Sequence, residues 1–187
     1  MGAARKAIEP PSAEQAAFLE RAIEQYGSVA YSYAYRLTRN EPDARDLVQE
    51  AFIRVYRAWR SFTPGTSFQA WLYRIITNLH RDELRRRKGR YYDEIPEDNA
   101  PQEWGGERPL AVEPIEEYLE GQYSETMAKA LDALSPDQRQ VLTLADIEEY
   151  SYQEISEIMG CSIGTVRSRL HRARNQLRRL VLKYSNV

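Results

Sequence analysis

Apolar residues recur at helical spacing through most of the chain, and no alternating run is long enough to predict a strand. In the first half this pattern predicts four helices, over residues 12–26, 29–39, 41–59 and 67–87. The segments between them carry helix-breaking or helix-starting residues: Gly27, Asn40 ahead of Pro42, and the turn sequence at 63–66. We therefore expect a first helical module at residues 12–90, preceded by a loose tail at residues 1–11.

Two of these helices carry apolar stripes that predict their buried faces. Residues spaced by three or four positions lie on one side of a helix, so each stripe marks the side that packs against the core. The stripe residues are Leu47, Ala51, Val55 and Trp59 in the third helix, and Phe68, Leu72, Ile75 and Leu79 in the fourth.

Residues 91–121 differ in composition from the helical segments on both sides. Ten acidic residues and a single base fall within 91–120, which gives this stretch a net charge of −9. Four prolines and two glycines interrupt the same stretch. Such a segment cannot bury enough apolar surface to order itself. The composition predicts a flexible acidic linker, with at most a short helix near residues 115–119.

Helix-capping signals define a second module at residues 122–187. Ser135 precedes Pro136 and is followed three residues later by Gln138, a pattern that opens a helix over residues 136–149. Ser151 and Glu154 form the same signal for a short helix over residues 152–159. Further helices are predicted over residues 124–133 and 163–183. The predicted fold is all-α, with two small helical domains joined by the acidic linker.

Composition narrows the possible functions. The net charge of −2 is a sum of segments of opposite sign, which is more informative than the total. Cys161 is the single cysteine, so the chain can form no internal disulfide and no thiolate-rich zinc site. No run approaches the roughly 18–20 apolar residues of a membrane span, and residues 1–11 lack the apolar core of a secretion signal. We expect a cytoplasmic protein without catalytic residues, metal or cofactor.

The strongest local signal is a helix-turn-helix between residues 152 and 170. Ile155, Met159 and Val166 are apolar where the two helices must pack, and Ser156 is small at their closest approach. Gly160 can adopt the positive φ that the tight turn requires.

The second helix of this motif is basic over its whole length. Seven bases and no acid fall between residues 163 and 183, which favours contact with phosphate. On its outer side, arginine can bind guanine through two hydrogen bonds, and serine and histidine can reach base edges. The candidate DNA-binding residues are Arg167, Ser168, His171, Arg172 and Arg174. A helical hairpin with a solvated basic helix is the alternative interpretation.

The fourth predicted helix carries a second basic run. Seven bases lie between residues 74 and 90, against Asp82 and Glu83. Upstream of the densest part, aromatic and amide side chains mix with cations, a combination that suits single-stranded DNA. The residues of this polar face are Tyr73, Thr77, Asn78 and Arg81. A surface helix with a basic end would give the same pattern.

Three segments resemble the extracytoplasmic-function (ECF) sigma factors of bacterial RNA polymerase. Residues 43–59 (DARDLVQEAFIRVYRAW) resemble the polymerase-binding helix of that family, and residues 68–78 (FQAWLYRIITN) resemble the helix that follows it. Residues 162–174 (SIGTVRSRLHRAR) are similar to its upstream promoter-reading helix. The three motifs occur in the family's order and spacing, which makes the resemblance far more specific than a lone helix-turn-helix.

The resemblance implies a role for each module. The first would bind the clamp helices of the largest polymerase subunit through Asp46, Gln49, Glu50 and Arg54. It would also hold a flipped base and melted minus-ten DNA through Phe62, Phe68, Tyr73, Arg74, Asn78 and Arg81. The second would read the minus thirty-five duplex through Arg167, Ser168, His171, Arg172 and Arg174, next to the β-subunit flap. An anti-sigma factor is a further partner implied by the family.

Two other functions compete with this interpretation. A stand-alone helix-turn-helix regulator would explain residues 122–187 but would leave the pattern of the first module unused. A helical nuclease would have to use the acids of the linker. Those acids lie in a segment broken by proline, whereas catalytic groups must be held to within about half an ångström.

Overall fold

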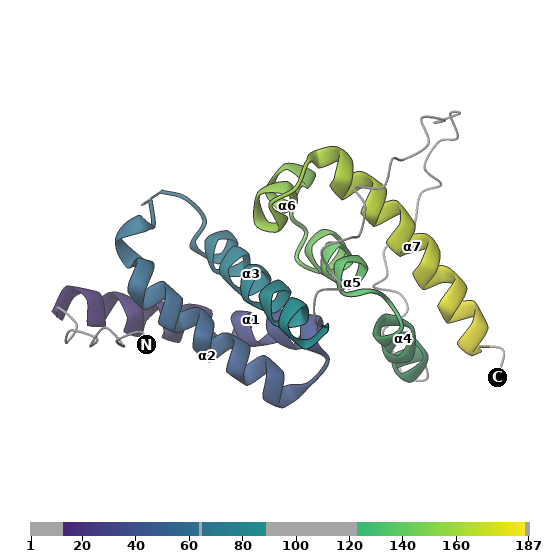
Figure 1. The fold of residues 1–187 in the computed structure, drawn as a ribbon, viewed down its shortest axis with the longest axis horizontal. Coiled ribbons are helices and arrows are strands. Elements are labelled where there is room, and N and C mark those ends of the chain that lie inside the picture. The colour runs from purple at the N-terminus through teal and green to yellow at the C-terminus, as the bar shows by residue number, and fades with distance from the viewer. Residues whose placement is uncertain (1–12, 64, 89–122, 186–187) are drawn as a thin grey trace, which may run out of the picture.

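The computed structural model describes residues 13–63, 65–88 and 123–185, and every regular element within these ranges is a helix. This confirms the all-α prediction. Figure 1 shows two groups of helices side by side. The predicted tail, the linker at 91–121 and its short helix lie outside the described residues. The first group contains α1 (Ala13–Thr38), α2 (Glu41–Ala58), the 3₁₀ turn η1 (Trp59–Ser61) and α3 (Phe68–Lys88).

The predicted break at Gly27 is wrong, because α1 runs without interruption from Ala13 to Thr38. The first module therefore has three α-helices and a short 3₁₀ turn in place of the four predicted helices. A glycine inside a helix costs only about 1 kcal/mol relative to alanine. The packing of α1 along both α2 and α3 outweighs that cost. Helix α1 ends at Thr38, and Arg39 then takes a positive φ of 54°.

Local sequence explains where α2 begins. The Asn40 side chain accepts a hydrogen bond from the backbone N–H of Asp43 at 2.9 Å, and Pro42 lies in the first turn. The apolar stripes pack as predicted: Leu47, Ala51 and Val55 are buried on α2, and Phe68, Leu72 and Leu79 are buried on α3. Trp59 and Ile75 are half-buried at the edges of the stripes.

The second group contains α4 (Tyr123–Asp132), α5 (Pro136–Leu142), the π-helical turn η4 (Thr143–Ile147), α6 (Tyr152–Met159) and α7 (Ile163–Ser185). The helix predicted over 136–149 is thus an α-helix that widens into a π-turn before it ends. Ser135 and Ser151 both form complete capping boxes, as the sequence predicts. Helix α7 packs along α4, α5 and α6 and closes the core of this module.

The two modules contact each other directly. Helices α1 and α3 of the first module pack against α5 and α6 of the second. In Figure 1, α3 lies beside the second group, and α2 lies on the far side of the first. The candidate DNA-binding face of α3 therefore lies close to the boundary between the modules.

Candidate nucleic-acid interfaces

The helix-turn-helix is built by α6 and α7. The Ser151 hydroxyl accepts from the N–H of Glu154 at 3.3 Å, and the Ser151 N–H donates to the Glu154 carboxylate at 2.9 Å. The hydrogen bonds from Ser151 lower the pKa of Glu154. Gly160 ends α6 with φ 64°, in the left-handed region that the turn requires. Ile155, Met159 and Val166 are buried between the helices.

The outer face of α7 presents several of the predicted DNA-binding residues together. Arg167, His171 and Arg172 are exposed on successive turns, with Ser168 half-buried between them. The Ser168 hydroxyl donates to the carbonyl of Thr165 at 3.1 Å, so its lone pairs remain available as acceptors.

Two arginines of the basic helix point back toward their own module. Arg174 forms a two-point ion pair with Asp146, with its Nε at 3.2 Å from the carboxylate, and is half-buried. The hydrogen bonds that Arg174 donates to Asp146 raise the pKa of its guanidinium. Arg169 lies 3.5 Å from Asp137. The exposed bases of α7 are Arg167, Arg172, Arg178, Arg179 and Lys183. The predicted seven-base helix therefore divides into an outer set and two inner anchors.

In the first module the predicted aromatic residues form a packed cluster. The rings of Phe62 and Phe68 meet edge-to-face at 5.4 Å, and the Trp71 ring lies 5.4 Å from that of Phe62. Phe18 of α1 contacts both phenylalanines. Phe68 is buried and Phe62 is half-buried, so this cluster fixes the chain between η1 and the start of α3.

The predicted single-strand face of α3 is only partly accessible. Arg74 and Asn78 are exposed. Tyr73 is fully buried, and its hydroxyl donates to the carboxylate of Glu148 at 2.8 Å. Burial and the bond to Glu148 raise the pKa of Tyr73. Arg81 is half-buried and donates to the carbonyl oxygen of Met159 at 3.0 Å. Both covered residues are held by the second module.

The candidate polymerase face lies on α2, away from the second module. Asp46, Gln49 and Arg54 are exposed, and Glu50 is half-buried 3.5 Å from Arg54. Beside them, an apolar groove separates α1 from α2. Its lining includes Leu19, Ile23, Val48, Gln49, Phe52 and Ile53. The apolar pattern of α2 alone did not indicate this groove, because its other wall is formed by Leu19 and Ile23 of α1.

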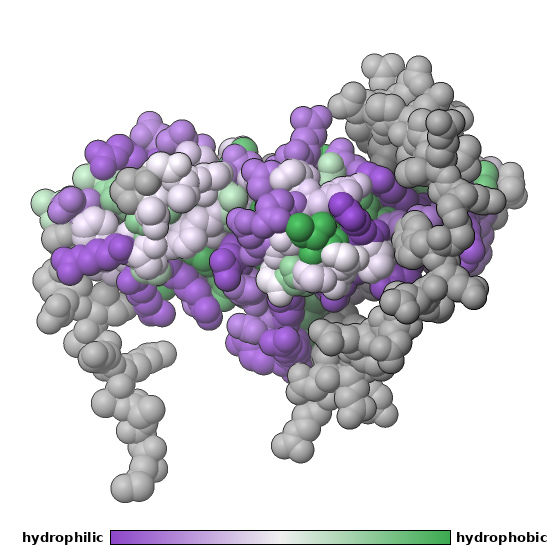
Figure 2. Space-filling model, turned by 90° about the horizontal axis from the view of Figure 1, so that it is seen from above, coloured by the Kyte–Doolittle hydropathy of each residue, from purple (hydrophilic) through white to green (hydrophobic). Residues whose placement is uncertain are grey.

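Hydrophobic exposure elsewhere is scattered. Figure 2 shows hydrophilic residues over most of the described surface on that side, with hydrophobic areas that are small. Apart from Ile23, which lines the groove, the large apolar side chains exposed among the described residues are Val29, Tyr35, Ile147, Tyr152 and Leu182. Single exposed hydrophobic residues of this kind are normal on protein surfaces and mark no binding site by themselves.

Two further observations concern the described ranges alone. None of the helices there combines the length and the apolar character needed to cross a membrane. Those ranges also hold no group of three or more histidine, cysteine, aspartate or glutamate side chains placed to bind a metal ion. Cys161 is half-buried beside Met159, and burial raises the pKa of its thiol.

Sequence comparison identifies both modules. Residues 22–90 match the family Sigma-70 region 2, and residues 124–177 match the family Sigma-70, region 4. The ECF RNA polymerase sigma factor SigE of Mycolicibacterium smegmatis is 42% identical over 166 residues, which are 88% of this chain and 62% of that protein. This chain thus spans less than two thirds of the length of that relative. SigW of Bacillus subtilis, also an ECF sigma factor, is 35% identical over 84% of this chain and 85% of its own length.

Structure comparison points the same way. The co-crystal structure of the sigma factor RpoE with the anti-sigma factor NepR from Bartonella quintana matches with a TM-score of 0.65 and 28% identity. That match covers 88% of this chain and 96% of the other. A structure of CnrH in complex with the cytosolic domain of CnrY matches with a TM-score of 0.57 and 23% identity, over 90% and 93% of the two chains. The second likeness concerns the fold alone.

Proposed function

The chain belongs to the ECF sigma factors of RNA polymerase, and on this basis we propose that it directs core polymerase to specific promoters and promotes DNA melting there. In this role it acts by binding and not by catalysis. It works in the cytoplasm, where it meets both polymerase and promoter DNA.

The observation that carries the proposal is the presence of region 2 and region 4 in one chain, in that order. A stand-alone helix-turn-helix regulator would need only the second module. It would leave the α3 face and the α2 face without a function. We take residues 12–90 and 122–187 as the two functional domains and residues 91–121 as the strap between them.

The first domain binds polymerase through one face and melted DNA through another. The α2 face (Asp46, Gln49, Glu50 and Arg54) binds the clamp helices of the largest polymerase subunit, and the apolar groove beside it extends the contact. On α3, exposed Asn78 and Arg74 contact the flipped base and the strand of the minus-ten element. Phe62 and Phe68 shape the adjoining loop, and Tyr73 and Arg81 complete the site once they are accessible.

The second domain reads the minus thirty-five duplex. Arg167, Ser168, His171 and Arg172 form the reading face, because they lie on the outer side of the second helix of the motif. Arg174 contributes by positioning, since its guanidinium is paired with Asp146 and holds α7 in place. The β-subunit flap is the polymerase element proposed to carry this domain.

Polymerase converts two weak contacts into one strong one. Polymerase holds both domains at a fixed separation. When one domain binds its promoter element, the effective concentration of the other domain near its own element therefore rises. Capture of a flipped base then offsets part of the unstacking cost, which is a few kcal/mol. An anti-sigma factor is a further proposed partner, because the sigma factor RpoE of Bartonella quintana forms such a complex.

Run-off transcription tests the proposal. Purified chain is added to core polymerase with a library of promoter templates, and the transcripts are sequenced. Transcripts with defined start sites, absent when core polymerase acts alone, are the expected result. If the chain confers no site-selective initiation at any concentration, the proposal is wrong.

A further inference from the structure

The contact between the two modules has a buried polar centre. The Tyr33 hydroxyl and the Thr77 hydroxyl of the first module lie 2.9 Å apart. Gln140 of the second module donates to Thr77 at 2.6 Å and to Tyr33 at 3.2 Å. All three side chains are buried, and burial raises the pKa of Tyr33 to about 12. Each polar group therefore finds its partner across the module boundary.

A carboxylate of the second module lies beside this centre. The Glu148 side chain is only 13% exposed and accepts from Arg36 at 2.5 Å and from the Tyr73 hydroxyl at 2.8 Å. The ring of Tyr73 also stacks on Tyr33 at 4.0 Å, which links this contact to the buried centre. A largely buried carboxylate needs both a cation and hydrogen bonds to be tolerated, and here the first module supplies them.

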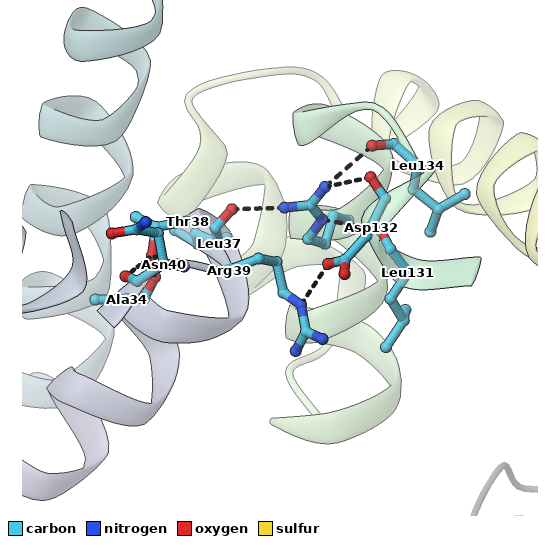
Figure 3. Close-up of polar contacts among 9 residues, drawn as sticks. Ala34, Leu37, Thr38, Arg39, Asn40, Leu131, Asp132 and Leu134 are labelled. Carbon is cyan, nitrogen blue, oxygen red and sulfur yellow. Dashed lines mark hydrogen bonds and ion pairs between the residues drawn. The ribbon is translucent and has the colours of Figure 1, made fainter. Parts of the chain in front are cut away.

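A third contact lies at the end of α1 (Figure 3). The Arg139 guanidinium donates to the carbonyl oxygens of Leu131 and Asp132, each at 3.1 Å, and to that of Leu37 at 2.9 Å. These carbonyls lie at the C-terminal ends of α4 and α1, where helices lack internal donors. Arg39 of the first module pairs with Asp132 at 2.6 Å. One arginine thus joins helix ends from both modules.

The chemistry of this interface favours reversible closure. The contacts described above are hydrogen bonds and ion pairs, and their polar groups can be hydrated when the modules separate. Permanent interfaces are more apolar, and polar contacts between domains normally allow relative motion. Within the described residues, no buried side-chain nitrogen or oxygen lacks a hydrogen-bond partner in the closed arrangement.

We propose that Glu148 occupies an anion site formed by Arg36 and Tyr73, and that a phosphate of the melted DNA strand takes this site when the modules separate. The inference rests on the proposed function. Glu148 and a phosphodiester share the same requirement, since each is an anion that accepts hydrogen bonds from arginine and a hydroxyl. The second module thereby keeps the free chain closed to single-stranded DNA.

Three features of the structure support this competition. Arg36 and Tyr73 both bind Glu148, and Tyr73 directly precedes exposed Arg74 on α3, so the site adjoins the α3 face. Arg81, on the same helix, is also held by the second module through the Met159 carbonyl. On α7, the proposed reader of duplex DNA, Arg167 is exposed in the same closed arrangement. Closure therefore covers Tyr73 and holds Arg81 on the single-strand face, while Arg167 on the duplex-reading face stays exposed.

The test compares Glu148→Gln with Glu149→Gln in the full chain without polymerase. Both changes remove one negative charge, but Glu149 is exposed and has no part in the interface contacts described. The probe is a fluorescein-labelled single-stranded oligodeoxynucleotide of mixed sequence, and binding is followed by anisotropy. We expect Glu148→Gln to bind about tenfold more tightly than wild type, and Glu149→Gln to bind as wild type does. Adding Arg36→Ala to Glu148→Gln should abolish the gain.

Small-angle X-ray scattering of the same proteins reports the separation of the modules. Glu148→Gln should enlarge the radius of gyration, whereas Glu149→Gln should not. The buried centre could hold the modules together even after Glu148→Gln. A double variant, Gln140→Ala with Glu148→Gln, therefore removes both contacts. If this double variant binds the probe no better than Glu149→Gln, or if Arg36→Ala leaves the gain intact, the inference is overturned.

Run-off transcription separates this inference from the proposed function. With saturating core polymerase, wild type and Glu148→Gln should reach the same transcript yield, because polymerase holds the modules apart in both. The wild-type protein should need a higher concentration than Glu148→Gln to reach half of that yield. Failure of all proteins to initiate would contradict the sigma activity. Equal half-maximal concentrations in active proteins would contradict the competition by Glu148.

Discussion

The two candidate DNA-binding faces differ in how the folded chain presents them. On α7, Arg167, His171 and Arg172 are exposed, and the inner arginines are anchored within their own module. On α3, Tyr73 is buried under Glu148, and Arg81 is tied to the carbonyl of Met159. One face is built by a single module, whereas the other is shared between two. We therefore expect duplex recognition to need only a folded second module, and single-strand recognition to need separation of the modules as well.

The largest effect is expected at the exposed part of the α3 face. Asn78→Ala should reduce open-complex formation by about a hundredfold, because capture of a flipped base offsets a few kcal/mol of unstacking. Upstream duplex contact should persist, and permanganate footprinting together with protection of the minus thirty-five element measures the two separately. Asp82→Ala, an exposed change one turn along α3, serves as the control. Equal loss at both promoter elements would contradict the division between the faces.

The next prediction concerns the pH dependence of folding stability, which depends on a buried histidine of α3. His80 on α3 is 8% exposed, and burial lowers its pKa from 6.5 to about 4. In the unfolded chain it takes up a proton near pH 6.5, while the folded chain excludes that proton until about pH 4. Stability is therefore complete above pH 6.5 and falls as the pH decreases toward 4. Between pH 7.5 and pH 5 the loss should be about 2 kcal/mol.

Urea unfolding of wild type and His80→Gln checks this pH dependence. The variant should lose about 2 kcal/mol less than wild type between pH 7.5 and pH 5, because glutamine does not titrate. The same slope in both proteins would refute the assignment to His80. The charged groups around this histidine are Arg139 and Asp137 on α5, Arg81 and Arg87 on α3, and Asp43 on α2.

A smaller effect on DNA binding is expected at the exposed face of α7. Arg172→Ala should weaken binding of the polymerase complex to the upstream duplex by about 1–3 kcal/mol, the range for loss of a bidentate base contact. Arg178→Ala changes another exposed arginine of α7, farther from the turn, and should weaken binding less and without sequence preference. Competition with mutated minus thirty-five sequences distinguishes the two. If both variants lose affinity equally for all sequences, α7 contacts only phosphate.

The smallest effect is expected on stability, at the turn that positions α7 against α6. Gly160→Ala should destabilise the chain by about 1–2 kcal/mol, because φ 64° places a Cβ close to the following carbonyl. Gly164→Ala is the matched control, since its Cβ would meet only the Ser162 hydroxyl at 3.7 Å within a helix. That change should be neutral or stabilise by up to about 1 kcal/mol. Thermal unfolding of both variants decides, and equal destabilisation would refute a role for the left-handed turn.

The sequence predicted the helices of both modules well where caps and turns made by neighbouring residues determine their ends. The capping boxes at Ser135 and Ser151 are present, and Gly160 adopts the positive φ that the turn was predicted to need. The prediction failed at Gly27, where a modest local preference opposed extensive packing. The helix over 136–149 was predicted without its π-turn, which no local pattern indicates.

The candidate site was predicted less completely than the fold. The residue types on α3 and α7 indicated nucleic-acid contact, but not which of those side chains the fold would cover or pair. Arg174 and Arg167 look alike in sequence, yet the fold gives only Arg174 a carboxylate partner within the module. Gln140 and Glu148 gave no signal at all, because a polar residue on a helix is ordinarily solvated.

Most of the helices, their caps, the tight turn and the family could be read from the sequence alone, since each depends on residues a few positions apart or on a linear motif. The contacts of Gln140 with Thr77 across 63 positions and of Glu148 with Arg36 across 112 became visible only in three dimensions. Such contacts form when helices from separate modules pack together. Their energy depends on distance and burial in space, which periodicity along a chain does not encode.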